Sequence, residues 1–167
     1  MADFRFTNEY SPSQREGVLD VLRRPRLWVP NTDYPDYQQW LGKVESQLSD
    51  NEKRAMVAYL GLAAVGAIVY QRHESKPGTV EIKNISVQPA TRGRYVGSFL
   101  LRNVELEATH HDFPECNKLI VDTKTSNLDM ITFLIRHHYS IAGIDDLYRL
   151  DAGPDATLAK TVGAHLQ

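Results

Sequence analysis

Hydrophobic residues along this chain alternate with polar residues in some segments and recur at helical spacing in others. Phe4 and Phe6 alternate with polar neighbours, which predicts a short first strand. Two longer apolar runs meet near Gly61 and predict a β-hairpin. By the same criteria strands are expected at 53–59, 62–73, 79–87 and 118–122, and two more within 139–150.

Helices are expected where apolar residues recur every three or four positions after a capping residue or a proline. Ser11 or Ser13 can cap the first helix, and Asn127 can cap the last. The other two are expected at about 35–48 and at about 95–110. The resulting order, β-α-α-β-β-β-α-β-α-β-β, predicts a mixed α+β fold. We expect a central, mostly antiparallel sheet of about seven strands flanked by about four helices.

Domain organisation follows from the breaks in this pattern. We expect one domain over residues 1–151, because the chain shows no linker and no repeat. Asp151-Ala152-Gly153-Pro154-Asp155 interrupts regular structure. Residues 152–167 are therefore expected to be a C-terminal tail, either a short helix or disordered.

The amino-acid composition is that of an ordinary folded, soluble protein. Its 167 residues are 42% hydrophobic and 24% charged, with a formal net charge of −2. That charge gives no general attraction to nucleic acid, so we expect no nucleic-acid partner. The single Cys116 fits a reducing compartment, and there is neither a signal-peptide pattern nor a membrane-length apolar run. We therefore expect a cytoplasmic protein without a membrane partner.

The segment from Val87 to Ser98 carries the clearest chemistry. A strand-like run ends at Val87, and Gln88-Pro89-Ala90-Thr91-Arg92-Gly93-Arg94 leads into an amphipathic helix pattern. Backbone N–H groups at a helix start bind phosphate, and arginines add positive charge. We predict a phosphate site formed by Arg92, Gly93, Arg94, Tyr95, Val96, Gly97 and Ser98, with Val87 in the same cofactor-binding set. The alternative is an ordinary turn before a helix, with solvated arginines.

The element order and this turn together resemble the GCN5-related N-acetyltransferase (GNAT) superfamily, over about residues 4–150. The family signature is Gln/Arg-x-x-Gly-x-Gly/Ala; Arg92 takes its first place, Tyr95 stands in place of the first glycine, and Gly97 takes the last place. The second family pattern is an Asn that opens a helix leading to aromatic residues and a Gly-Phe. Asn127 and Phe133 fit it; Leu134 stands where many members carry Tyr, His138 where Gly is usual, and Tyr139 where Phe is usual.

The resemblance implies acetyl-CoA as the co-substrate, without a metal. Its pyrophosphate would lie on the Arg92–Ser98 turn and its pantetheine between splayed fourth and fifth strands. Asn127 would bind the pantetheine arm, although a pure helix cap is an equally good interpretation. Phe133 would belong to the same cofactor-binding set.

Two residues are candidates for proton transfer. Glu81 shares a strand face with Val87 and matches a position where some family members carry a catalytic Glu, so it is the candidate general base. The alternative is a surface carboxylate paired with a lysine. A Tyr at the position of Leu134 would protonate the departing thiolate; Tyr139 is the nearby substitute, with a core aromatic as the alternative.

An aromatic and acidic segment between the first two helices is the candidate acceptor site. Aromatic rings and carboxylates can receive a cationic amine, whereas the alternative is that they cover the core and cap a helix. The candidates are Trp28, Tyr34, Asp36 and Tyr37. The histidines and Cys116 show no recognised metal-ligand spacing, so we expect no metal.

The expected function is therefore an N-acetyltransferase that moves an acetyl group from acetyl-CoA to a primary amine of a small molecule or peptide. Two alternatives stay open: a non-catalytic acyl-CoA-binding regulatory module, and an acetyltransferase toxin that acts on aminoacyl-tRNA. A homodimer is an expectation by analogy with the family.

Overall fold

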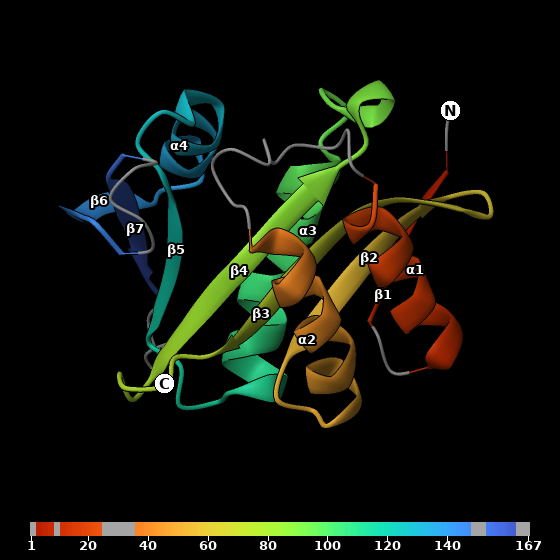
Figure 1. The fold of residues 1–167 in the computed structure, drawn as a ribbon, viewed down its shortest axis with the longest axis horizontal. Helices are drawn as coiled ribbons and strands as arrows, with labels where there is room; N and C mark the ends of the chain where they lie inside the picture. Colours follow the sequence, from red (N-terminus) through yellow and green to blue (C-terminus); the bar gives the residue numbers. More distant parts are fainter. Residues whose placement is uncertain (1–2, 9–10, 25–35, 148–152, 163–167) are drawn as a thin grey trace. The chain divides into compact units, whose positions relative to one another are not determined.

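The computed structural model describes residues 3–8, 11–24, 36–147 and 153–162. It has a mixed α+β fold, with a seven-stranded, mostly antiparallel sheet in the order β1-β2-β3-β4-β5-β7-β6 and four α-helices within the described residues (Figure 1). This confirms the predicted fold class. The elements are β1 (Phe4–Asn8), α1 (Pro12–Leu22), α2 (Tyr37–Ser49), β2 (Arg54–Leu60), β3 (Ala63–Arg72), β4 (Thr79–Val87), α3 (Val96–Glu107), β5 (Lys118–Lys124), α4 (Leu128–Arg136), β6 (Ser140–Asp145) and β7 (Asp155–Thr161).

The chain folds as two compact units that share strand β4. The first unit contains Met1–Gln71 and Lys83–Leu106, and the second contains Arg72–Ile82 and Glu107–Gln167.

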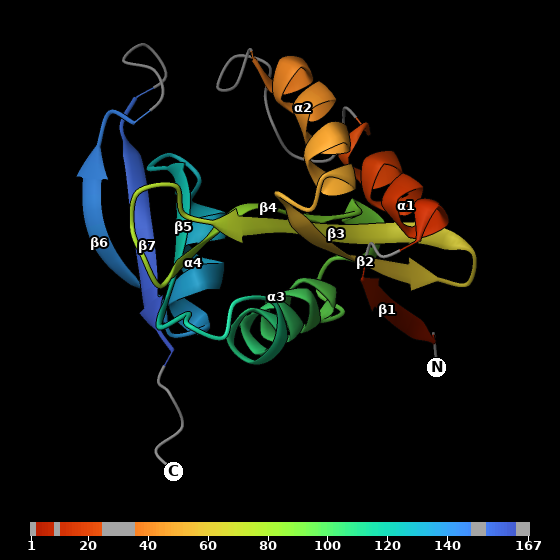
Figure 2. The ribbon, with the colours of Figure 1, turned by 90° about the horizontal axis from the view of Figure 1, so that it is seen from below.

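The first unit is a three-layer arrangement around antiparallel strands. β1 pairs with β2, and β2 pairs with β3. Figure 2 shows α1 and α2 on one side of these strands and α3 on the other. One core cluster joins α1 and α2 to the strands through buried side chains that include Val18, Leu22, Val44, Val57 and Val69.

Helix α1 begins where its sequence predicts. The Ser11 hydroxyl accepts the N–H of Gln14, and the Gln14 side chain accepts the N–H of Ser11, so the two form a capping box. Pro12 follows at the first helical position, where its missing N–H costs no hydrogen bond. The apolar positions Val18, Leu19, Val21 and Leu22 are then buried together.

Gly66 on β3 lets α3 approach the sheet closely. A Cβ at this position would lie 3.1 Å from the Ser86 backbone oxygen and 3.2 Å from side-chain carbons of Val96 and Leu100. The start of α3 therefore packs directly on the β3 backbone, which fixes the helix that follows the predicted phosphate turn.

The second unit is built on β5. The beginning of β4 pairs with β5 in parallel over four residue pairs, from Thr79↔Lys118 to Ile82↔Val121. β5 then pairs with β7, and β7 with β6, both antiparallel. Helix α4 connects β5 to β6, and Leu134 is its fully buried residue.

The prediction for the C-terminal tail is wrong where it touches residues 155–161. These residues form β7, which lies between β5 and β6 in the sheet, rather than a helix or a disordered tail. The Gly153-Pro154 break precedes the strand instead of ending the fold. The described part of 139–150 contains one strand, β6, where two were expected. The seventh strand, β7, comes later in the chain. Among the described residues, none of the helices is both long enough and apolar enough to cross a membrane.

Candidate functional site

The predicted phosphate turn is a short 3-10 helix followed by a left-handed turn. Pro89–Thr91 form the 3-10 turn, and the buried Thr91 hydroxyl donates to the Gln88 carbonyl oxygen over 2.9 Å. Gly93 has a φ of +74°, and a Cβ there would meet open space. The Thr91 side chain therefore holds the turn in place through this hydrogen bond. Thr91 was not among the predicted site residues, although a Thr three residues after its hydrogen-bond acceptor is a common turn pattern.

Tyr95 has a left-handed backbone conformation at the place where the family signature has a glycine. Its φ is +63°, in the left-handed region that favours glycine, and its side chain is 74% exposed. The Phe99 N–H donates to the Tyr95 carbonyl oxygen over 2.9 Å, so Tyr95 leads directly into α3. The departure from the family signature therefore places an exposed ring at a position whose backbone conformation favours glycine.

The two arginines of the turn play different structural parts. Arg92 Nε donates to the Val87 carbonyl oxygen over 3.1 Å, which ties the turn to the end of β4. Arg94 is exposed. The helix start at Val96 follows, and the geometry of any helix leaves its first N–H groups without partners inside the helix. Donor N–H groups and cationic side chains therefore gather within Arg92–Ser98, which fits an anionic phosphate.

Glu81 is buried on β4, in register with Ile120 of β5. Alternation along the strand places it on the same face as Lys83, Ile85 and Val87. The surface part of the alternative is wrong, because Glu81 is only 8% exposed, whereas its pairing with a lysine stays an alternative. A general-base role for Glu81 stays a prediction.

Asn127 caps α4 and is held in place by its neighbours. Its Oδ1 accepts the Met130 N–H over 3.3 Å, and its Nδ2 donates to the Thr123 hydroxyl over 3.3 Å. Its own N–H donates to the Lys124 carbonyl oxygen. The cap interpretation is confirmed, whereas a contact with a pantetheine arm stays a prediction.

The second family pattern continues from Asn127 through α4, and Leu134 and Tyr139 are buried near the C-terminal end of that helix. Leu134 is fully buried, and the Tyr139 ring is 3% exposed with Lys160 Nζ 5.6 Å from its centroid. Phe133 packs against the His137 ring, with centroids 4.7 Å apart. His138 has a φ of +67° where the family usually carries glycine, so this position too keeps a glycine-like backbone. Tyr139 has the burial of a core aromatic, and its role as an acid stays a prediction.

Half of the predicted acceptor residues can be located. Trp28 and Tyr34 lie outside the described residues. Asp36 is exposed at the start of α2 and makes no side-chain cap bond. The Tyr37 hydroxyl donates to the Leu22 carbonyl oxygen over 2.8 Å, and its ring stacks on Trp40. Burial raises the pKa of Tyr37, so this phenol stays protonated and joins α2 to the end of α1.

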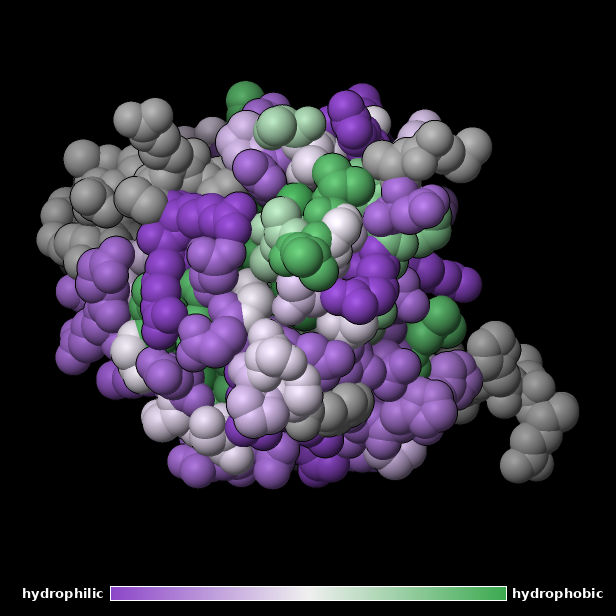
Figure 3. Space-filling view, turned by 90° about the vertical axis from the view of Figure 1, so that its right-hand side faces the viewer, coloured by the Kyte–Doolittle hydropathy of each residue, from purple (hydrophilic) through white to green (hydrophobic). Residues whose placement is uncertain are grey.

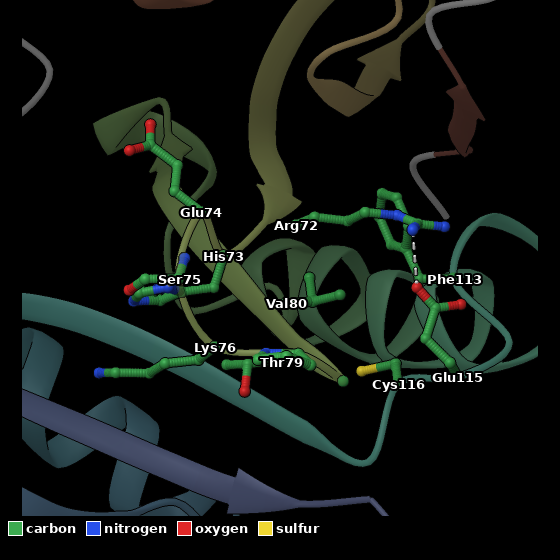
Figure 4. A pocket seen from close by; sticks show the side chains of 12 residues that line it. Arg72, His73, Glu74, Ser75, Lys76, Thr79, Val80, Phe113, Glu115 and Cys116 are labelled. Atoms are coloured by element: carbon green, nitrogen blue, oxygen red, sulfur yellow. Dashed lines mark hydrogen bonds and ion pairs between the residues drawn. The ribbon is translucent and has the colours of Figure 1, made fainter.

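A cavity of about 490 Å³ lies in the second unit, and its lining includes none of the predicted site residues. It is formed by the β3–β4 connection and residues near Phe113. Figure 4 shows the Arg72 guanidinium beside the Phe113 ring and linked to Glu115, with Glu74 and Lys76 extending away. Arg72 Cζ lies 5.0 Å from the Phe113 ring centroid, and Arg72 Nη1 lies 3.0 Å from Glu115 Oε1. Arg72 and Glu115 thus neutralise each other, and we assign no ligand to this cavity.

Cys116 lies at the edge of the same cavity and has the properties of a structural thiol. Burial raises its pKa, and its Sγ donates to the Lys118 carbonyl oxygen over 3.4 Å. Within the described residues, no group of three or more His, Cys, Asp or Glu side chains is placed to hold a metal ion.

Comparison with known proteins agrees with this geometry. The model of the Acetyltransferase (GNAT) family matches residues 15–139, which is more than half of the chain. No curated protein sequence matches.

Solved structures share the fold at low identity. An acetyltransferase of the GNAT family from Desulfovibrio desulfuricans has a TM-score of 0.77 and 18% identity, covering 96% of this chain and 100% of that one. PaiA N-acetyltransferase from Thermoplasma acidophilum, in complex with coenzyme A, has a TM-score of 0.69 and 13% identity, over 96% and 99%. A GNAT family acetyltransferase from Elizabethkingia anophelis, with acetyl-CoA bound, has a TM-score of 0.66 and 16% identity, over 95% and 98%. On the strength of the family match, which spans the predicted phosphate turn and α4, the chain belongs to the GNAT acetyltransferase family.

Proposed function

We propose that the protein transfers an acetyl group from acetyl-CoA to a primary amine of a small-molecule or peptide acceptor. The single observation that carries this proposal is the Val87–Ser98 segment, which holds a glycine-like turn and a helix start within the region matched by the family. The bound coenzymes of the relatives from T. acidophilum and E. anophelis support the choice of co-substrate. We also propose a cytoplasmic location, since Cys116 is a free thiol.

The donors of the turn suit the coenzyme. N–H groups from Gly93 to Ser98 and the charge of Arg94 would hold the pyrophosphate, while Arg92 keeps the turn attached to β4. The Asn127 amide would hydrogen-bond the pantetheine arm, with Phe133 beside it. The Val87 backbone N–H would polarise the thioester carbonyl.

The reaction forms one carbon–nitrogen bond and breaks one carbon–sulfur bond. Glu81 would accept the proton of the ammonium group, directly or through water, so that a neutral amine attacks the thioester carbonyl. The coenzyme thiolate leaves and takes a proton from solvent or from the Tyr139 hydroxyl. Leu134 has no proton to give, and a thiolate is a good enough leaving group to depart without a dedicated acid.

Calorimetric titration with acetyl-CoA tests the binding part of the proposal. Arg94→Ala should weaken binding about tenfold, because one charge-assisted hydrogen bond is lost. Arg102→Ala is the matched control on α3, where Arg102 is exposed and lies 3.8 Å from Glu105; it should leave the affinity unchanged. Absence of acetyl-CoA binding at millimolar concentration would refute the proposal.

The role of Glu81 is tested by turnover. Glu81→Gln should lower turnover with an amine acceptor by about 10²-fold and leave the affinity for acetyl-CoA unchanged. The exposed Glu74→Gln serves as the control. Unchanged turnover in Glu81→Gln would remove Glu81 as the base.

A further inference from the structure

Two aromatic side chains lie exposed at the start of α3. Tyr95 is 74% exposed and Phe99 is 55% exposed. The hydrogen bond from the Phe99 N–H to the Tyr95 carbonyl oxygen, 2.9 Å long, sets them one helical turn apart. Both belong to the first unit, so their relation to each other and to the turn is defined within one compact body.

Phe99 has a fixed position on this surface. Its ring lies against Phe6 of β1, with centroids 5.6 Å apart and planes tilted by 47°. Tyr95 comes one turn earlier and projects into solvent, directly between the arginine-containing turn and Phe99. The Tyr95 ring thus adds little to the packing of the fold.

Exposure of hydrophobic residues alone does not indicate a ligand. Figure 3 shows hydrophobic residues gathered near the centre of one face of the molecule, bordered by hydrophilic ones. Leu62, in the β2–β3 hairpin, is 98% exposed. What distinguishes Tyr95 is its place beside Arg92, Arg94 and the helix start, where donors for phosphate gather.

An aromatic ring next to a phosphate site matches a ligand that carries both an aromatic base and phosphate. Coenzyme A is such a ligand, because its pyrophosphate is joined to a phosphorylated adenosine. A tyrosine ring can stack on a purine face, and the arginines complement the negative charge of the adenosine phosphate.

We propose that the Tyr95 ring stacks on the adenine of coenzyme A and thereby makes the protein prefer the complete coenzyme to a donor that ends at phosphopantetheine. This inference rests on the proposed function, since it requires the coenzyme to occupy the turn. It assigns Tyr95 as a specificity-determining residue at the position where the family signature has a glycine without a side chain.

The test measures the binding of two ligands to two variants at position 95. Tyr95→Gly removes the ring and accepts the φ of +63° without strain, so the turn keeps its backbone. Tyr95→Phe keeps the ring. Calorimetry then measures the contribution of the ring to coenzyme A and to 4′-phosphopantetheine, which lacks the adenosine together with its 3′-phosphate and one phosphate of the pyrophosphate.

We expect Tyr95→Gly to weaken coenzyme A binding by about 5- to 150-fold, the range for loss of one base–aromatic stack. Binding of 4′-phosphopantetheine should stay the same, and Tyr95→Phe should bind both ligands like the wild type. Leu62→Ala, which removes an even more exposed apolar side chain from the same unit, should change neither affinity.

Three outcomes would overturn the inference. Tighter binding of coenzyme A by Tyr95→Gly would mean that the side chain crowds the phosphates. An equal loss for both ligands would assign Tyr95 to the turn and not to the adenine, and no change would remove it from the site. Each of these outcomes requires a wild-type protein that binds coenzyme A, so it overturns this inference and leaves the proposed function standing. A wild-type protein that binds no coenzyme A would overturn both.

Discussion

Lys124 Nζ donates to Asp155 Oδ2 over 2.9 Å, and the two side chains are only 2% and 0% exposed. The same ammonium donates to the Gly153 carbonyl oxygen over 3.0 Å. Lys124 is the last residue of β5 and Asp155 is the first of β7. The ion pair therefore joins the two strands at the end of β5 that leads to Asn127 and α4. A buried charge without its partner is costly, whereas a well-packed apolar pair of similar size is not.

Lys124→Met should therefore lower the free energy of unfolding by about 3–5 kcal/mol, measured by urea denaturation. The double variant Lys124→Met/Asp155→Leu should recover most of that loss. Glu45→Gln breaks the exposed Arg23–Glu45 pair, whose atoms lie 3.5 Å apart, and should cost about 1 kcal/mol or less. Equal losses in the buried and exposed variants would contradict this assignment.

Asn127 allows its cap role and its proposed ligand role to be separated. Asn127→Ala removes the acceptor of the Met130 N–H and should cost about 1 kcal/mol of stability. Asn127→Asp keeps an acceptor at the cap but loses the donor NH₂ group, so stability should change little while the KM for acetyl-CoA rises severalfold. If Asn127→Asp has the wild-type KM, the residue is a cap and nothing more.

The end of α4 predicts a stabilising substitution. The His138 N–H donates to the Ile135 carbonyl oxygen over 3.0 Å and the Tyr139 N–H to Leu134 over 3.1 Å, which is a Schellman motif with His138 at the left-handed position. His138→Gly should raise the free energy of unfolding by about 1 kcal/mol, because glycine adopts this conformation without a Cβ penalty.

His137→Gly is the control for that substitution in thermal and urea unfolding. His137 has a φ of −97° and packs on Phe133, so glycine there removes a contact and gains no conformational relief. We expect a lower stability for His137→Gly. A loss of stability in both variants would show that the His138 conformation carries no strain.

Cys116 should react slowly in the folded protein. Burial raises the pKa of its thiol above the ordinary value, so the folded state favours the neutral form. The stability that this preference contributes is complete below the ordinary thiol pKa and is lost as the pH rises through the raised one. The rate of alkylation by iodoacetamide against pH should therefore rise at a higher pH in the native protein than in urea. Coincident curves in the two states would contradict the burial of the thiol.

The sequence predicts most of this fold because local pattern and tertiary structure agree. Ser11 and Asn127 begin the helices that they were expected to cap, and the β2–β3 hairpin turns at Gly61, which has a φ of +61°. The predicted strand β4 ends at Val87, where the predicted phosphate turn starts. Each of these features depends on neighbours a few residues away.

Other features depend on residues far apart in the chain, and the sequence pattern could not predict them. β7 has few large apolar side chains and becomes a strand because β5 and β6 pair with it on both sides. The Lys124–Asp155 pair joins residues 31 positions apart. The backbones at Tyr95 and His138 keep a glycine-like conformation although neither residue type predicts it.

Transfer of a labelled acetyl group from acetyl-CoA to a panel of primary amines tests the central claim most directly. We expect at least one amine to gain the label and free coenzyme A thiol to appear in equal amount. We also expect Glu81→Gln, with unchanged affinity for acetyl-CoA, to slow both. Binding of acetyl-CoA without labelled amine or thiol release above the rate without protein would contradict the account and favour a non-catalytic acyl-CoA-binding module.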